Sequence, residues 1–381
     1  MRQRTVLYLS GALIAGWTAY LLAENWLVAS VALDSNYSHA QVSPTVAAGT
    51  FRAAFLIICI AVLGCIFLTE KREWVWRQAE PHVTSWVTTL GCSAILLLEL
   101  FYQGKELYSL SGVIEHPGIT SLTGKRLLFA SIAIVLHQLR PTLSNKTLIL
   151  ASQAPAVVFT TWAVGRWCLV AVGRRFSWVG QILLVFFLVP TIRYYTFYDV
   201  GIVGFYALIF TEIYLGRYWQ TVPLVALATL NHENSLLLVP VIFACAAAGG
   251  SFRKAAGISL SALAGYAAVR LLLAHFLPAP GIGRPHLYTN SHSITHFGPE
   301  LVPPAAILGL RWLLAAAGFR YAPPPIRKMA VFWPFLFVVT YVFGQLGEAR
   351  QFNADIPYCI VLVLLLLEHA SLAPERGERT A

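Results

Sequence analysis

Long apolar runs separated by short polar stretches recur along the chain and constrain its fold more than any other feature. They match the hydrocarbon core of a bilayer, which a helix crosses in about 20 residues. Only 12% of the 381 residues are charged, against about 25% in soluble domains, so the chain could not cover a water-facing surface. The sequence therefore predicts an all-α, polytopic transmembrane helical bundle. We expect one integral membrane domain over residues 1–381, with a short cytoplasmic tail at 372–381.

The apolar runs predict the individual membrane spans. We expect about ten to thirteen crossings. The predicted spans lie near residues 6–29, 51–69, 84–102, 127–142, 147–172, 177–190, 199–215, 255–277, 303–318, 329–346 and 356–370.

Basic residues give the formal net charge of +10 and gather at the ends of the apolar runs. Cytoplasmic loops carry such an excess under the positive-inside rule, which places the N-terminus in the cytoplasm and favours an uncleaved first helix. We expect an integral protein of the bacterial inner membrane. The orientation can be inferred from each end of the chain separately. Where the two inferences meet, across residues 103–175, they differ by one membrane crossing.

The basic residues are not pooled in one domain, so we expect no nucleic-acid partner. The six cysteines fall inside apolar runs without metal-ligand spacing, and they imply no disulfide framework. The chain has no Walker loop, zinc-binding HExxH motif or dinucleotide-binding GxGxxG motif, so nothing supports cytosolic nucleotide chemistry.

The stretch ATLNHENSLLLVP, Ala228 to Pro240, places a carboxylate in the middle of an apolar segment. Residues 219–250 are too many for one span and too few for two ordinary ones. They predict a broken-helix hairpin, two short helices that meet at NHENS, because irregular backbone at this depth must be satisfied by protein or water. Asn231, His232 and Glu233 then either bind substrate or form a polar cluster that ties the half-helices together.

Three further polar stretches are expected on the outer face together with NHENS. RYYTFYD offers a substrate site at Arg193, Tyr194, Tyr195 and Asp199 or, alternatively, an interfacial anchor. GEARQFNADIP contributes Glu348 and Arg350 as a substrate site or as an ion pair at a helix end. Asp34, in the first outer loop, is the candidate catalytic base, and the alternative is a solvated helix cap.

The stretch GRPHLYTNSHSITHFGPE is expected to be a histidine-bearing loop on the outer face, and its His286, His292 and His296 have a spacing that matches no metal motif. We therefore assign no metal ligand and no cofactor. Nothing in the sequence supports a divalent metal ion.

Several motifs, taken in order, resemble the GT-C superfamily of integral membrane glycosyltransferases. A first helix, an outer loop with Asp34 and the run FRAAFL are similar to the start of that superfamily. RYYTFYD followed by LATLNHENSLLL resembles bacterial GT-C-like proteins in which a stretch LA-x-LN, a basic residue and Glu follow a tyrosine-rich turn. GEARQFNADIP is similar to their E-x-R-x-F motif.

The resemblance implies transfer of a sugar from a polyprenyl-phosphate-linked donor to an acceptor on the outer face, with inversion. An outer-loop carboxylate deprotonates the acceptor hydroxyl in this family, and Asp34 matches it by position. Basic residues hold the phosphate leaving group. The expected partners are the lipid-linked donor, membrane lipids and other proteins of envelope and polysaccharide biosynthesis. This chain has one acid in that loop where many members have two, and it lacks a large soluble C-terminal domain, so neither a metal nor a protein acceptor is implied.

Two other classes remain open from the residues alone. A Wzy-like or EpsG-like polysaccharide polymerase would also be polytopic, with outer arginines and a histidine before an apolar run, as at His232. A transporter of a lipid-linked or anionic substrate would need a polar pathway with inner and outer vestibules, and the inner loops have little polarity. A noncatalytic membrane subunit is a further alternative.

Overall fold

The structure is a computed structural model of the whole chain. It describes residues 81–103, 128–173, 176–189, 191, 199–276, 286–296, 302–344, 346 and 349–377. The spans predicted near 6–29 and 51–69 lie outside these residues.

The described residues form helices and no strand. Four segments are long and apolar enough to cross a membrane, namely Thr147–Ala171, Phe252–Phe276, Pro324–Phe343 and Arg350–His369. The α-helices are α4 (Pro81–Gln103), α6 (Ala130–Leu139), α7 (Asn145–Ala171), α8 (Ser177–Leu188), α9 (Asp199–Tyr214), α10 (Thr221–Asn231), α11 (Leu238–Ala248), α12 (Phe252–Phe276), α13 (Leu287–Thr295), α14 (Val302–Phe319), α15 (Pro324–Met329), α16 (Phe332–Phe343) and α17 (Ile356–Gly377). Short 3-10 helices are η4 (Tyr218–Gln220), η5 (Glu233–Leu237) and η7 (Ala349–Asp355). The predicted all-α class is confirmed for this part of the chain.

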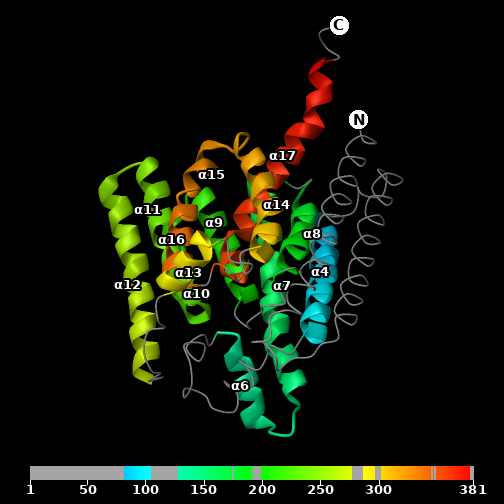
Figure 1. Ribbon diagram of the computed structural model, residues 1–381, viewed down its shortest axis with the longest axis vertical. Helices are drawn as coiled ribbons and strands as arrows, with labels where there is room; N and C mark the ends of the chain where they lie inside the picture. The colour runs from blue at the N-terminus through cyan, green and yellow to red at the C-terminus, as the bar shows by residue number, and fades with distance from the viewer. Residues whose placement is uncertain are drawn as a thin grey trace.

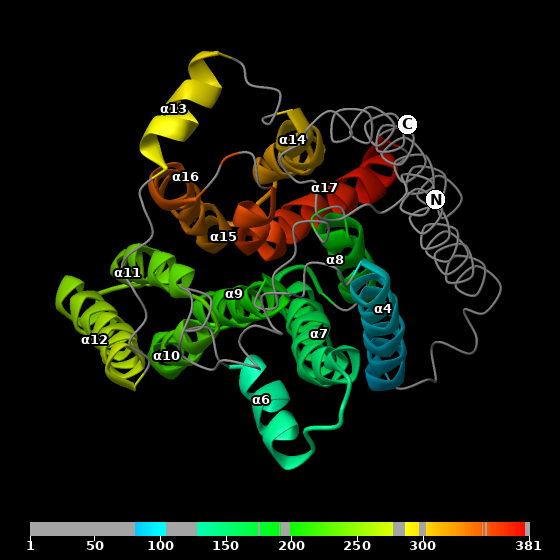
Figure 2. The ribbon, with the colours of Figure 1, turned by 60° about the horizontal axis from the view of Figure 1, so that its bottom comes forward.

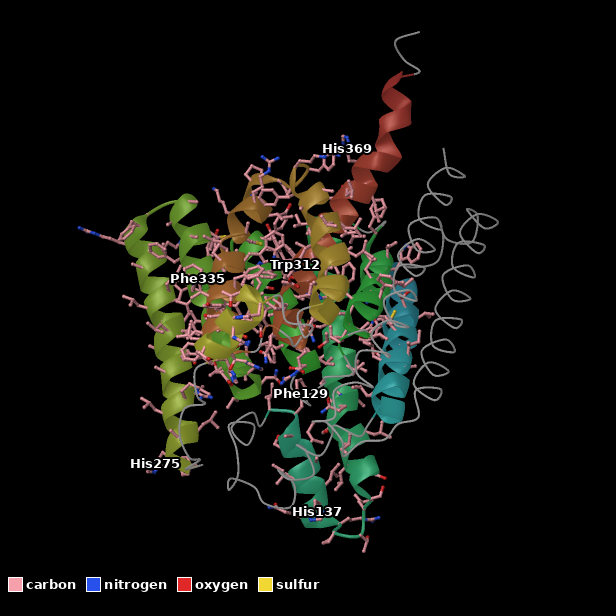
Figure 3. All side chains as sticks on the ribbon, viewed as in Figure 1. Phe129, His137, His275, Trp312, Phe335 and His369 are labelled. Atoms are coloured by element: carbon pink, nitrogen blue, oxygen red, sulfur yellow. The ribbon has the colours of Figure 1, made fainter. Side chains whose placement is uncertain are left out.

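The helices form a bundle with two distinct ends (Figure 1). The end with α15 also holds the connection between α11 and α12, and His369 lies there (Figure 3). The opposite end holds α6 and the C-terminus of α12, with His137 and His275 (Figure 3). We call these the α15 end and the α6 end.

The centre of the bundle is the pair α7 and α9, which pack along much of their length. Gly204 on α9 makes this possible, because a Cβ there would lie only 2.7 Å from atoms of Phe159 and Thr160. Small residues let membrane helices approach closely in this way. The Thr160 hydroxyl also donates to the Val200 carbonyl across the interface at 2.8 Å.

Residues 221–248 form the predicted hairpin of two short helices, with NHENS at the turn. Each helix has 11 residues, about 16 Å at 1.5 Å per residue, or half of a bilayer core. At the α15 end the Tyr218 hydroxyl donates to the Cys245 carbonyl at 3.2 Å. The start of the first helix of the hairpin, α10, therefore lies close to the end of the second, α11. Burial raises the pKa of Tyr218, which keeps this hydroxyl protonated. Both α10 and α11 pack against α12 (Figure 2).

Three elements differ from the sequence prediction. Helix α6 has only 10 residues where a span near 127–142 was predicted, and it lies beyond the α6 end of α4 (Figure 1). The stretch predicted as a histidine-bearing loop contains α13, because Asn290 binds backbone groups at the end of α16. The second half of GEARQFNAD, predicted in an outer loop, is buried as part of η7.

Candidate functional site

Segments far apart in the sequence meet where α9 begins. Asn231, at the end of α10, lies against Gly201, since a Cβ on that glycine would lie 2.8 Å from Asn231 Oδ1. The Leu128 N–H donates to the Leu230 carbonyl at 3.2 Å and ties the residues before α6 to the hairpin turn. From η7, Arg350 reaches Asp199, with Nη1 3.8 Å from Oδ2. Three of the predicted polar stretches therefore come together.

We call residues 231–235 the polar junction. Its irregular backbone is satisfied by protein groups, as a bilayer environment requires. The Tyr206 hydroxyl donates to the Asn234 carbonyl at 2.6 Å, and the Thr229 and Ser235 hydroxyls bond each other at 2.8 Å. The junction thus breaks the helix without leaving these backbone and hydroxyl groups unpaired.

His232 is fixed by its neighbour in the turn. Its Nδ1 accepts the Asn234 backbone N–H at 3.0 Å, which assigns an unprotonated Nδ1 and a proton on Nε2 in the neutral ring. The 3.9 Å separation between His232 Nδ1 and Glu233 Oε2 is therefore a contact rather than an ion pair. His232 is 7% exposed, so the ring is part of the packed interior.

Glu233 pairs with a cation that was not among the predicted site residues. Arg270, in the last third of α12, places Nη1 3.9 Å from Glu233 Oε2. The two side chains are 26% and 28% exposed, so the pair lies at the boundary of the packed interior. A carboxylate at membrane depth costs about 2.5–3.5 kcal/mol on insertion scales, and pairing with Arg270 offsets part of that cost. An arginine inside the apolar run AAVRLLL was the available signal.

The pair of Asp199 and Arg350 joins the tyrosine-rich turn to η7. Asp199 is buried at the first turn of α9, where a carboxylate is favoured by the helix dipole. The Arg350 side chain is 16% exposed against 6% for Asp199. A forked guanidinium in this position can hold a carboxylate or a phosphate oxygen.

The far end of η7 is held by a second ion pair. Arg311 Nη2 lies 2.8 Å from Asp355 Oδ1, and the two side chains are 1% and 0% exposed. The Trp312 indole donates to Asp355 Oδ2 at 2.6 Å (Trp312 is labelled in Figure 3). The sequence analysis placed Asp355 in this stretch without assigning it a role, and it missed Arg311, although an arginine within LGLRWLL is itself unusual in a membrane helix.

A separate ion-pair group lies toward the α15 end. Glu212 Oε1 is 3.6 Å from Arg166, and Glu212 Oε2 is 3.9 Å from Arg217. These residues join the last part of α7 and α9 to the base of the hairpin. Glu212 lies about three and a half helical turns from Asp199 along α9, so this group is not part of the polar junction.

Of the predicted site residues, the structure pairs Asp199 with Arg350 and places Asn231, which His232 and Glu233 follow in the polar junction, against Gly201 two residues further along α9. The others, Asp34, Arg193, Tyr194, Tyr195 and Glu348, lie outside the described residues. Within the described part of the chain, no group of three or more His, Cys, Asp or Glu side chains could hold a metal ion. The rings of His292 and His296 instead pack against each other at the end of α13, tilted by 34° with their centroids 4.1 Å apart.

Comparisons of this chain with protein-family models, curated proteins and solved structures gave no match. The fold alone defines the class. An all-α bundle with four helices that are long and apolar enough to span a bilayer indicates a multi-pass membrane protein. The chemistry at its polar junction carries the functional argument below.

Proposed function

We propose that this chain is a membrane glycosyltransferase of GT-C type that moves a sugar from a polyprenyl-phosphate-linked donor to an acceptor at the outer face of the membrane. The observation that carries the proposal is that three of the predicted stretches meet where α9 begins, since Arg350 lies 3.8 Å from Asp199 and Asn231 lies against Gly201. Asp199, Asn231 and Arg350 each come from one of the stretches that resemble this superfamily. Their proximity is what a shared substrate site requires.

The residues divide the proposed reaction into two tasks. Asp34 accepts the proton of the acceptor hydroxyl, which makes that oxygen a nucleophile. The hydroxyl oxygen attacks the anomeric carbon with inversion, and the bond from that carbon to the phosphate oxygen breaks. Arg193 and Arg350 stabilise the negative charge on the departing lipid phosphate.

The remaining predicted residues bind and orient the donor. Asn231, His232 and Glu233 present hydrogen-bonding groups close to the start of α9. Tyr194, Tyr195, Asp199 and Glu348 complete the proposed substrate-binding set. Asp199 and Glu233 are each paired with an arginine, so a phosphate competes with a carboxylate for a cation already in position.

The distribution of basic residues supports an outward-facing junction. The α15 end carries Arg217, Arg253 and Lys254 beside the hairpin base and α12, and Arg327 and Lys328 on α15. The positive-inside rule then places that end in the cytoplasm. We treat the short α6 as a helix that does not cross the membrane. The orientations inferred from the two ends of the chain then agree across residues 103–175, with the N-terminus in the cytoplasm.

Mass spectrometry of lipid-linked glycans tests the function. Bacterial cells that lack the gene should accumulate the unused polyprenyl-phosphate sugar and lose one sugar from an envelope glycan. Restoring the gene should reverse both changes. Identical glycan profiles with and without the gene would contradict the proposal.

A further inference from the structure

The stretch that carries Arg350 is fastened at both ends by side chains from other helices. Before it, Asn290 of α13 donates through Nδ2 to the carbonyls of Tyr341 and Gly344, at 2.7 and 2.8 Å. Asn290 Oδ1 accepts the Leu346 N–H at 3.1 Å. One buried side chain therefore fixes the backbone that leaves α16 and leads into η7.

The other end is fastened more firmly. Arg311 Nη2 donates to the Phe352 carbonyl at 3.1 Å and lies 2.8 Å from Asp355 Oδ1. A single nitrogen thus bridges the middle and the end of η7. Asn353 Nδ2 donates to Thr191 Oγ1 at 3.0 Å, which links η7 to a residue two positions before the tyrosine-rich turn.

The burial of this ion pair calls for a role beyond stability. Arg311 is 1% exposed, and its Nε and Nη1 have no hydrogen-bond partner in the described part of the chain. A buried ion pair often stabilises a protein no better than apolar side chains of the same size, whereas it can select one arrangement among several. Here the arrangement it selects is that of η7.

We propose that Arg311 is a positioning residue that sets the place of Arg350 opposite Asp199. It touches neither partner of that pair and acts through the backbone of η7. The inference concerns geometry and holds whether or not the chain transfers sugars, while its importance for activity rests on the proposed function.

Chemical cross-linking tests the geometry without an activity assay. The substitutions Asp199→Cys and Arg350→Cys are made together, with Cys59 and Cys65 replaced by serine. Cys92, Cys168, Cys245 and Cys359 are buried and are kept. A short bifunctional methanethiosulfonate reagent then reports how often the two positions come together in the full chain in its membrane. The parent without the two new cysteines gives the background.

The variant Arg311→Met should lower the rate of cross-linking about tenfold, because a charge-assisted hydrogen bond shifts an equilibrium by about ten- to a hundredfold. Arg311→Lys should keep most of the rate, since one ammonium nitrogen can replace the bridging Nη2. Glu212→Gln, which removes a buried carboxylate at the far end of α9, should change the apparent melting temperature but leave the rate unaltered.

If Arg311→Met does not fold, the double variant Arg311→Met/Asp355→Leu takes its place. It removes both charges, so no buried charge is left without its partner. A folded double variant with slow cross-linking supports the proposal. Either folded variant cross-linking at the parent rate would overturn it, and so would an equal loss in Glu212→Gln, which would indicate general loosening.

Discussion

Glu233 shows how one residue can be tolerated inside an apolar segment. It sits at the turn of a hairpin that covers about half of the bilayer, beside Arg270 and 28% exposed. Asn231 and His232 before it are almost fully buried, and His232 Nδ1 accepts a backbone N–H of the turn itself. The carboxylate is therefore the most accessible of these three side chains, and we expect it to touch substrate.

At this scale, Glu233→Gln should lower the rate of sugar transfer about 10- to 100-fold, equivalent to about 1.4–2.7 kcal/mol in the barrier. The amide keeps the size of the side chain but loses the charge that pairs with Arg270. The transfer rate in membranes, normalised to protein level, is the measurement. Glu212→Gln is the matched control and should leave transfer intact. Wild-type transfer by Glu233→Gln would show that Glu233 is only structural.

At the scale of helices, α14 approaches α17 closely at Gly318. A Cβ on Gly318 would collide with the carbonyl group of Leu362, a backbone atom that cannot swing aside. Gly309, on the same helix, has no atom within 4 Å of its Cβ position. Substitutions at these two glycines therefore distinguish the effect of close packing from the effect of helix propensity within one helix. The same interface positions Arg311 against η7.

Gly318→Ala should destabilise the protein by about 1–3 kcal/mol, because the helices must move apart to admit a methyl group. Gly309→Ala should be neutral or slightly stabilising, since alanine is the better helix former. Thermal unfolding of the purified protein in detergent measures both. Equal melting temperatures for the two variants would contradict this account of the interface.

The sequence was sufficient to predict helices whose existence depends on length and apolarity. The hairpin at 219–250 followed from a segment too long for one span, with polar residues at its centre. The pairing of Arg311 with Asp355 could not be predicted in the same way. An arginine in an apolar run is visible in the sequence, but its partner depends on how α14 packs against η7.

Helix α13 was missed for a similar reason. Its residues have no helical apolar pattern, and Asn290 holds it through contacts with the end of α16. Of the candidate site, the sequence indicated Asp199, Asn231 and Arg350, whereas it showed Arg270 only as a cation in an apolar run, without its partner. That residue becomes relevant only once α12 lies against the hairpin.

At the scale of the whole molecule, the bundle has a strongly basic α15 end and a polar junction nearer the opposite end. The orientation proposed above places Thr142, in the exposed turn after α6, outside the cell. Ser251, exposed between α11 and α12, is placed in the cytoplasm. Thr142 lies within residues 103–175, where the sequence left one crossing unaccounted for. Ser251 follows the hairpin, which returns to the side of the membrane from which it enters.

Single cysteines at these positions test the topology. An impermeant thiol reagent should label Thr142→Cys in intact cells, and it should label Ser251→Cys only after permeabilisation, because an impermeant reagent cannot cross the bilayer. The parent protein reports any labelling of its native cysteines. The reverse pattern would invert the proposed orientation, and equal labelling of both positions from outside would contradict the returning hairpin.

The central claim is that an outer-loop carboxylate activates an acceptor hydroxyl beside this junction, and Asp34→Asn tests it most directly. The variant should reach the membrane at the wild-type level, yet membranes that contain it should show no transfer of sugar from the lipid-linked donor, because an amide cannot accept the proton. Its loss should exceed that of Glu233→Gln, whereas a transporter would show the opposite ranking. Full transfer activity in Asp34→Asn, at an unchanged membrane level, would contradict the account.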